Sequence, residues 1–130
     1  MIAVSGSGIA GLAAALAVLR NQKPLLLVAG QTPATTLQGG VQIAPNGWAA
    51  LDQLGLGDTA RARATTLQAI TVRDMRSAAT LASLDLSASP YASLSRADLA
   101  SLLKAEIRAL SGMTDIAANI THVVQRGPDQ

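Results

Sequence analysis

An α/β fold, in which a parallel central sheet is accompanied by an antiparallel hairpin, is what this 130-residue sequence predicts. The first observation is a G-x-G-x-x-G spacing near the N-terminus, placed between a strand-like and a helix-like segment. The second is a pair of later segments in which every other residue is apolar. The third is apolar residues that recur at helical spacing in much of the remaining chain.

The first two elements are expected at residues 2–4 and 9–19. Residues 2–4 are a short apolar run, typical of a central strand that is buried on both faces of a parallel sheet. In residues 9–19, Leu12 and Leu16 recur at helical spacing and alanines fill most of the remaining positions. Because this helix is apolar nearly all round, we expect it to be buried.

The glycines between these elements have three different roles in a Rossmann-like turn. Gly6 allows the tight turn out of the strand, Gly8 lets a pyrophosphate approach the backbone, and Gly11 permits close packing of helix on strand. The unpaired N–H groups and the positive dipole end of the helix then favour an anion without any basic side chain. The residues expected at the diphosphate form a segment that we call the glycine turn: Gly6, Ser7, Gly8, Ile9, Ala10 and Gly11.

A second strand is expected at residues 25–28, and it ends without the acidic residue that usually holds the ribose of a dinucleotide. The next residues are Ala29 and Gly30, which offer a ribose only main-chain groups. We therefore expect the nucleotide to be bound more weakly than in a complete site of this type.

Further along the chain, the sequence predicts a loop at residues 32–40 and a short extended segment at 41–43. Pro45 should open a helix that carries Trp48 on its apolar face and ends at Gly55. Asp58 is in position to cap the short turn that follows.

The second half of the sequence predicts a hairpin from residues 67–74 and 80–86. Ser95 and Asp98 have the spacing of a capping box before a helix that Gly112 should end. A last strand is expected at residues 120–124.

Composition excludes several classes of function. The net charge is only +2 and the basic residues are dispersed, which argues against a nucleic-acid partner. The absence of cysteine excludes disulfides and thiolate catalysis and agrees with a cytoplasmic location. The apolar helix is too short to span a membrane. His122 is the single histidine, so we expect no metal site and nominate no catalytic residue.

Three stretches resemble the N-terminal part of FAD-dependent aromatic-ring monooxygenases of the p-hydroxybenzoate and salicylate hydroxylase type. They are GSGIAGLAAALAVLR at residues 6–20, GGVQIAPNGWAALDQLGLGD at 39–58 and LSRADLASLL at 94–103. The resemblance implies that the glycine turn faces the pyrophosphate of FAD. It also implies that Arg96 lies near the phosphate or ribityl part of the cofactor, a role that suits a permanent forked cation.

The resemblance further implies a single FAD-binding domain over residues 1–130 that is incomplete relative to the family. The chain ends before the family's Gly-Asp flavin motif, so we expect no turnover by this chain alone. Full-length relatives would use NAD(P)H and oxygen to hydroxylate an aromatic substrate. Two alternatives remain open: an interaction module that associates with itself or a partner through unpaired sheet edges, and a stand-alone NAD-binding module.

Overall fold

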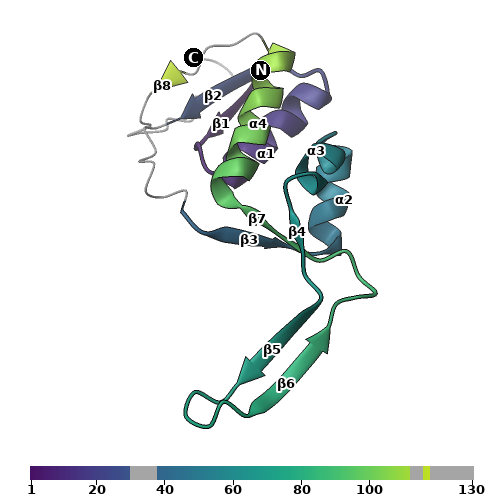
Figure 1. The fold of residues 1–130 in the computed structure, drawn as a ribbon. Coiled ribbons are helices and arrows are strands. Elements are labelled where there is room, and N and C mark those ends of the chain that lie inside the picture. The colour runs from purple at the N-terminus through teal and green to yellow at the C-terminus, as the bar shows by residue number, and fades with distance from the viewer. Residues whose placement is uncertain (30–37, 112–115, 118–130) are drawn as a thin grey trace, which may run out of the picture. The chain divides into compact units, whose positions relative to one another are not determined.

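The chain forms two compact units in a computed structural model that describes residues 1–29, 38–111 and 116–117. One unit comprises Met1–Thr36 with Leu103–Gln130, and the other comprises Leu37–Leu102. The last helix, α4 (Arg96–Ser111), begins in the second unit and ends in the first (Figure 1).

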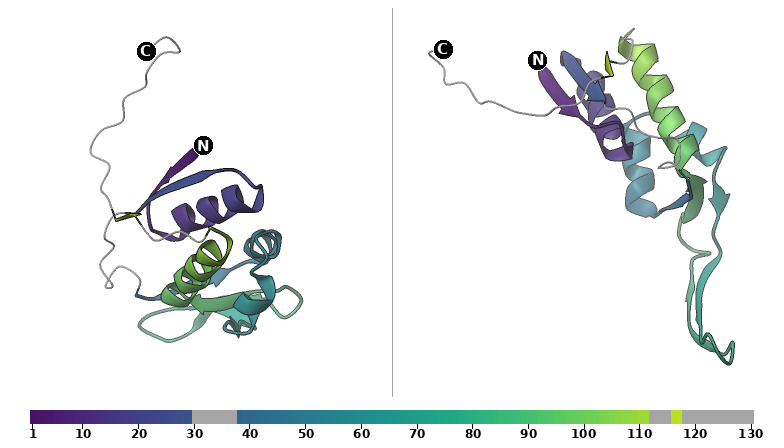
Figure 2. Two further views of the ribbon diagram at one scale, coloured as in Figure 1. Left: turned by 90° about the horizontal axis from the view of Figure 1, so that it is seen from above. Right: turned by 90° about the vertical axis from the view of Figure 1, so that its left-hand side faces the viewer.

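The first unit is built on a parallel sheet. Its described strands lie in the order β1-β2-β8, and the helix α1 connects β1 to β2. The pairing of β1 with β2 runs from Ile2 opposite Leu25 to Ser5 opposite Val28. Both strands lie on the same side of α1 in the two views of Figure 2. The bounds of these elements are β1 (Ile2–Ser5), α1 (Ile9–Arg20), β2 (Leu25–Ala29) and β8 (Ile116–Ala117).

Two details of the first unit differ from the sequence prediction. Among the described strands β2, not β1, is central, because β2 pairs with both β1 and β8, and Ile2 of β1 is 44% exposed. The helix is buried on one face, not all round. Its buried residues are Leu12, Ala15 and Leu16, whereas Ala10 and Ala14 are exposed.

Backbone hydrogen bonds end α1 in a Schellman arrangement. The Gln22 N–H donates to the Leu19 oxygen (2.9 Å), and the Lys23 N–H donates to the Val18 oxygen (3.1 Å). The residue that makes the turn, Gln22, has a φ of +54°, which is normally the place of a glycine. Gln22 therefore ends the helix in a backbone conformation that residues with a side chain rarely adopt.

The second unit contains an antiparallel sheet and two short helices. The sheet has the order β3-β7-β4, and the sequence prediction missed both β7 and β4. Ala92 and Leu94 of β7 are buried, so this strand supplies part of the core of the unit. The elements are β3 (Gly40–Ile43), α2 (Pro45–Gln53), α3 (Gly57–Arg61), β4 (Thr65–Thr66) and β7 (Ala92–Ser95).

The connection from α2 to α3 confirms one prediction and corrects another. Trp48 is buried, and Gly55, at φ +71°, makes the predicted Schellman turn, in which the Leu56 N–H donates to the Leu51 oxygen (2.8 Å). Asp58, however, does not cap α3. The N-cap residue is Leu56, and Asp58 lies inside the first turn of α3. The tight turn at Gly55 places the start of α3 before Asp58, where the sequence predicted the cap.

The predicted hairpin is confirmed as β5 (Ala69–Arg73) and β6 (Thr80–Asp85), which pair antiparallel. The carboxylate of Asp74 organises the connecting turn. It accepts hydrogen bonds from the N–H groups of Arg76 (3.1 Å) and Ser77 (2.7 Å). Donation from Ser77 holds the pKa of Asp74 below its ordinary value.

At the start of α4, the structure contains one of the two hydrogen bonds of the predicted capping box, the one accepted by the serine hydroxyl. The Asp98 N–H donates to the Ser95 Oγ (3.2 Å), as expected for an N-cap serine. The apolar spacing of residues 99–110 predicts one buried helix face of five residues, of which four are buried and Leu110 is 45% exposed. The buried ones are Leu99, Leu102, Leu103 and Ile107. The predicted stop at Gly112 and the strand at 120–124 lie outside the described residues.

The two Schellman turns lead to a matched pair of predictions. Gln22→Gly should raise the free energy of unfolding by about 0.5–1 kcal/mol, because glycine adopts a positive φ without the Cβ penalty. Gly55→Ala should lower it by about 1 kcal/mol or more for the same reason. Thermal melting of the full chain measures both. Equal effects of the two substitutions in the same direction would contradict this explanation.

Candidate nucleotide-binding site

The glycine turn joins the end of β1 to the start of α1, as the sequence predicted. The Gly6 N–H donates to the Val28 oxygen (2.9 Å), so the turn begins as an extension of the parallel ladder. Gly6 then leaves the strand with a φ of +125°, a conformation that L side chains rarely adopt. This residue is therefore where the chain reverses toward the helix.

Gly8 lies at the helix N-terminus and borders open space. It is the N-cap of α1, with extended backbone (φ −75°, ψ 173°), and its oxygen accepts the first helical hydrogen bond, from the Leu12 N–H (3.0 Å). A Cβ built on Gly8 would meet no atom within 4 Å among the described residues. A methyl group there would fill space next to the helix N-terminus, which is the space that a diphosphate requires.

Gly11 lies one turn into the helix, directly against Gly6. A Cβ on Gly11 would collide with the Gly6 oxygen and would lie 2.9 Å from the Gly6 carbonyl carbon. The backbones of helix and turn approach each other closely only because this residue has no side chain. The structure therefore supports the packing role predicted for Gly11.

The electrostatics of the helix N-terminus suit an anion. The N-cap residue of α1, Gly8, makes no side-chain cap, and the first turn contains no acidic residue. The first N–H groups of an α-helix have no acceptor within the helix, and the dipole concentrates partial positive charge there. Ile9 and Ala10 form the first turn and Ser7 lies between two glycines, so main-chain groups dominate this surface.

Ala29 ends β2 at the same edge of the sheet as the glycine turn. Ser5 is opposite Val28, which places Ala29 one residue beyond the pair from which the turn starts. Its backbone pairs with Ala117 of β8. The residue at the usual ribose position thus carries a methyl group instead of a carboxylate.

Arg96 is the first residue of α4, and its side chain is exposed. Its N–H donates to the Gly39 oxygen (3.0 Å), which ties the start of α4 to the residue that precedes β3. Arg96 belongs to the unit Leu37–Leu102, whereas the glycine turn belongs to the other unit. Its role at the cofactor stays a prediction.

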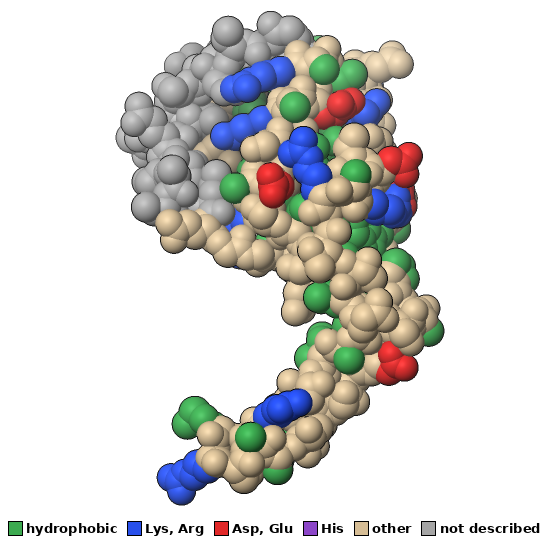
Figure 3. All heavy atoms as spheres, in the orientation of Figure 1, with side chains coloured by type: hydrophobic (Ala, Val, Ile, Leu, Met, Phe, Trp, Pro, Cys, Tyr) green, Lys and Arg blue, Asp and Glu red, His purple; other side chains and the backbone are tan. Residues whose placement is uncertain are grey.

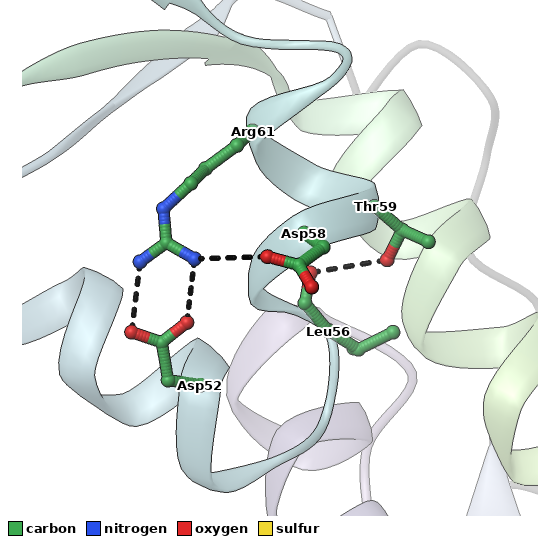
Figure 4. Close-up of polar contacts among 5 residues, drawn as sticks. All are labelled: Asp52, Leu56, Asp58, Thr59 and Arg61. Atoms are coloured by element: carbon green, nitrogen blue, oxygen red, sulfur yellow. Dashed lines mark hydrogen bonds and ion pairs between the residues drawn. The ribbon is translucent and has the colours of Figure 1, made fainter.

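A hollow of about 180 Å³ lies within the second unit, and the guanidinium of Arg61 forms part of its wall. That guanidinium lies 4.9 Å from the centre of the Trp48 ring. It also makes a forked pair with the carboxylate of Asp52, with bonds of 2.7 and 2.8 Å (Figure 4). Donation from Arg61 lowers the pKa of Asp52. The hollow is lined by Trp48, Arg61, Ala64, Thr66, Pro90, Tyr91 and Ala92.

This hollow is a weaker candidate for a ligand site than the glycine turn. Ligand pockets usually measure about 300–1,000 Å³, and the charge of Arg61 is already paired with Asp52 and, at 3.7 Å, with Asp58. The ends of the exposed Asp52 and Arg61 side chains also lie close to Gly57. A Cβ on Gly57 would collide with the Asp52 Oδ1 and lie 2.6 Å from a guanidinium nitrogen of Arg61.

Within the described residues, no cluster of His, Cys, Asp or Glu could hold a metal ion. His122 lies outside them. Among the helices of the described segments, none combines the length and hydropathy that crossing a membrane requires.

Comparison with known proteins shows sequence similarity to aromatic-ring monooxygenases. The chain is 30% identical over 125 residues to 3-hydroxybenzoate 6-hydroxylase 1 of Aquipseudomonas alcaligenes, covering 91% of this chain and 32% of that protein. It is 39% identical over 105 residues to 3-amino-4-hydroxybenzoate 2-monooxygenase PtnB3 of Streptomyces platensis, covering 75% of this chain and 26% of the relative. No protein-family model matches.

Solved structures show the same relationship in the fold. The tetrameric form of 2-methyl-3-hydroxypyridine-5-carboxylic acid oxygenase matches with a TM-score of 0.74 and 25% identity over 88% of this chain and 30% of that one. Klebsiella pneumoniae HpxO, in complex with FAD and uric acid, matches with a TM-score of 0.65 and 25% identity over 78% of this chain and 27% of its own.

These matches confirm the predicted fold class and the resemblance to the N-terminal part of FAD-dependent aromatic-ring monooxygenases. The chain spans about a third of the length of these relatives.

The geometry of the turn predicts different costs for two alanine substitutions. Gly11→Ala should lower the free energy of unfolding by about 1–3 kcal/mol, because the new methyl group would force helix and turn apart. Gly8→Ala should cost less than about 1 kcal/mol, because its backbone is extended and the added methyl group meets no described atom. Thermal or urea unfolding measures both. A larger loss for Gly8→Ala would contradict the packing role assigned to Gly11.

Proposed function

We propose that this chain, which matches the N-terminal third of flavin-dependent aromatic-ring monooxygenases, binds the ADP end of FAD through its glycine turn. The observation that carries the proposal is the open, uncapped N-terminus of α1, held against β1 by Gly11. This arrangement presents main-chain N–H groups and bare glycines where a diphosphate would approach. The supporting comparisons are the similarity to a hydroxybenzoate monooxygenase and to the solved structure of HpxO, which is in complex with FAD.

FAD is a better candidate than NAD for this turn. Many dinucleotide-binding proteins share the glycine spacing, which by itself does not separate the two. The similarity, however, continues through 91% of the chain to a hydroxybenzoate hydroxylase and includes segments far from the turn. A stand-alone NAD-binding module has no comparable support.

Each residue of the proposed site would contribute one interaction or one structural feature to FAD binding. The N–H groups at the start of α1 would hold the diphosphate, Gly8 would leave room for it, and Gly6 would aim the turn. Arg96, a permanent cation, would add positive charge near the phosphate or ribityl part. When bound, FAD supplies the redox chemistry.

We propose that a protein containing this chain together with the remaining parts of its relatives oxidises NAD(P)H and hydroxylates an aromatic ring with oxygen. The names of the hydroxybenzoate hydroxylases support the aromatic substrate. We also propose that the chain acts as one FAD-binding domain in the cytoplasm, which the cysteine-free composition supports.

A second proposed property is self-association through unpaired sheet edges. In the described structure, β5 and β6 pair only with each other, so each leaves one edge of hydrogen-bonding groups without a strand partner. This property would serve a non-catalytic interaction module as well as a cofactor-binding domain, and it does not depend on FAD.

FAD binding should appear as a rise in melting temperature. At a ligand concentration 100 times the Kd, binding adds about 2.7 kcal/mol to the free energy of unfolding. Gly8→Ala should weaken FAD binding at least tenfold, because its methyl group occupies the diphosphate space. Ala14→Ser, at an exposed position of the same helix, is the matched control and should bind normally. Stabilisation by NAD but not by FAD would overturn the choice of cofactor.

Restoring the missing carboxylate should strengthen the site. Ala29→Glu is expected to increase the affinity for FAD and ADP about tenfold, since a carboxylate that accepts hydrogen bonds from ribose hydroxyls contributes about 1.5–3 kcal/mol before the cost of ordering its side chain. Inorganic pyrophosphate, which has no ribose, is the control ligand and should not gain affinity. Isothermal titration calorimetry measures all three. An equal gain for pyrophosphate would contradict the ribose assignment.

A further inference from the structure

We propose that the ribose end of this site accepts adenine nucleotides whose ribose carries an additional phosphate, about as well as it accepts unphosphorylated ones. Its ligand class would then include 2′-phosphorylated adenine dinucleotides besides FAD and ADP. This proposal rests on the proposed binding of a diphosphate at the glycine turn, and it concerns the residue at the end of β2.

The strand register brings the end of β2 level with the glycine turn. Ser5 is opposite Val28 in the parallel pair, and the Gly6 N–H donates to the Val28 oxygen (2.9 Å). Ala29 is the next residue of β2, and its backbone pairs with Ala117 of β8, so strand pairing continues to this position. In dinucleotide sites of this type, an acidic residue here accepts a hydrogen bond from the ribose 2′-hydroxyl. The residue at position 29 therefore decides which substituents the 2′ oxygen can carry.

An acidic residue at this position would select against a phosphorylated ribose for two reasons. Its carboxylate only accepts hydrogen bonds, and a phosphorylated 2′ oxygen has no proton to donate. The carboxylate also repels a phosphate monoester, which carries about 1.5–2 negative charges at pH 7, and like charges repel most strongly where water is partly excluded. Ala29 has neither effect. Because specificity of this kind depends on a repulsive group, its removal widens the range of ligands.

No other acidic side chain among the described residues of the first unit can replace this repulsion. The sequence has no Asp or Glu before Asp52, so β1, the glycine turn, α1 and β2 contain no acidic residue. Within the described part of that unit, the acidic residue is Glu106 of α4, which pairs with Arg20 at the C-terminal end of α1. The 12 residues of α1 span about 18 Å, which exceeds the Debye length of about 8 Å at physiological salt.

The charge that does act at the site favours an anion. The N-terminus of α1 carries the positive end of the helix dipole, and its first turn contains no acidic residue. On the face drawn in Figure 3, basic and acidic side chains are interspersed, so that face has no broad basic patch that would hold any anion without regard to its ribose. Discrimination between phosphorylated and unphosphorylated ribose thus depends on the end of β2.

Isothermal titration calorimetry of the full chain with a matched pair of ligands tests the proposal. ADP-ribose and 2′-phospho-ADP-ribose share the diphosphate and differ by one phosphate. The unmodified chain should bind both, with Kd values within about threefold of each other. Ala29→Glu should weaken binding of the 2′-phosphorylated ligand at least tenfold relative to ADP-ribose. Ala29→Gln, which adds a side chain of the same size without the charge, is the matched control and should bind the two ligands about equally.

The possible failures are distinguishable. If the unmodified chain binds ADP-ribose and rejects its 2′-phosphate tenfold or more, the ribose end excludes phosphate and the proposal is overturned, while the diphosphate site stands. If the chain binds neither ligand nor FAD, the diphosphate site and the proposal both fail. Equal losses in the glutamate and glutamine variants would overturn the charge argument. Thermal melting of both variants confirms that they are folded.

Salt provides a second readout that separates charge from size. Raising the NaCl concentration from about 0.05 to about 0.5 M should reduce the preference of the Ala29→Glu variant for ADP-ribose, because screening weakens repulsion between carboxylate and phosphate. A preference that salt leaves unchanged would show that the glutamate acts by its bulk, and it would contradict the role assigned to charge at the end of β2.

Discussion

The close approach between the first turn of α1 and the end of β1 is the constraint on which the candidate site depends. Gly11 can lie against the backbone of Gly6 only because Gly11 has no side chain, since a single methyl group at Gly11 would collide with the Gly6 oxygen. This contact fixes the direction in which the helix N-terminus points relative to the sheet. The same backbone turn then leaves Gly8 facing open space. Within this short segment, Gly11 thus meets the requirement of helix packing, and Gly8 meets the requirement of open space for a ligand.

The proposed site would recognise charge through the backbone, so it does not depend on the residue at the ribose position. A helix N-terminus attracts a diphosphate whether or not a carboxylate follows the second strand. Ala29 would offer a ribose no side-chain hydrogen bond, whereas the proposed diphosphate contacts would come from main-chain groups of another segment. The expected outcome is a site with reduced affinity that still distinguishes diphosphates from uncharged ligands.

The second unit follows the same physical rules of helix capping and apolar burial. Its helix α2 ends in a Schellman turn at Gly55, and Leu56 is buried directly after it. The Asp52–Arg61 pair then links α2 to α3, with the carboxylate pKa lowered by the hydrogen bonds that it accepts. The apolar side of the hairpin continues this core outward from Leu86, so the unit buries its apolar residues fully only where a second layer covers them.

The amino-acid sequence by itself determined the local elements: the strand, turn and helix around Gly6 to Gly11, the stop at Gly55, and the hairpin. Each of these depends on interactions among residues close in the chain, such as helical periodicity or the conformational freedom of glycine. Only the tertiary structure decided the rest. The strands β4 and β7 have two and four residues and become strands through distant partners. Which segments pack together likewise decides that β2 is central, that α1 is buried on one side and that β6 is exposed. A local sequence pattern does not determine this, because burial depends on contacts with residues distant in the chain.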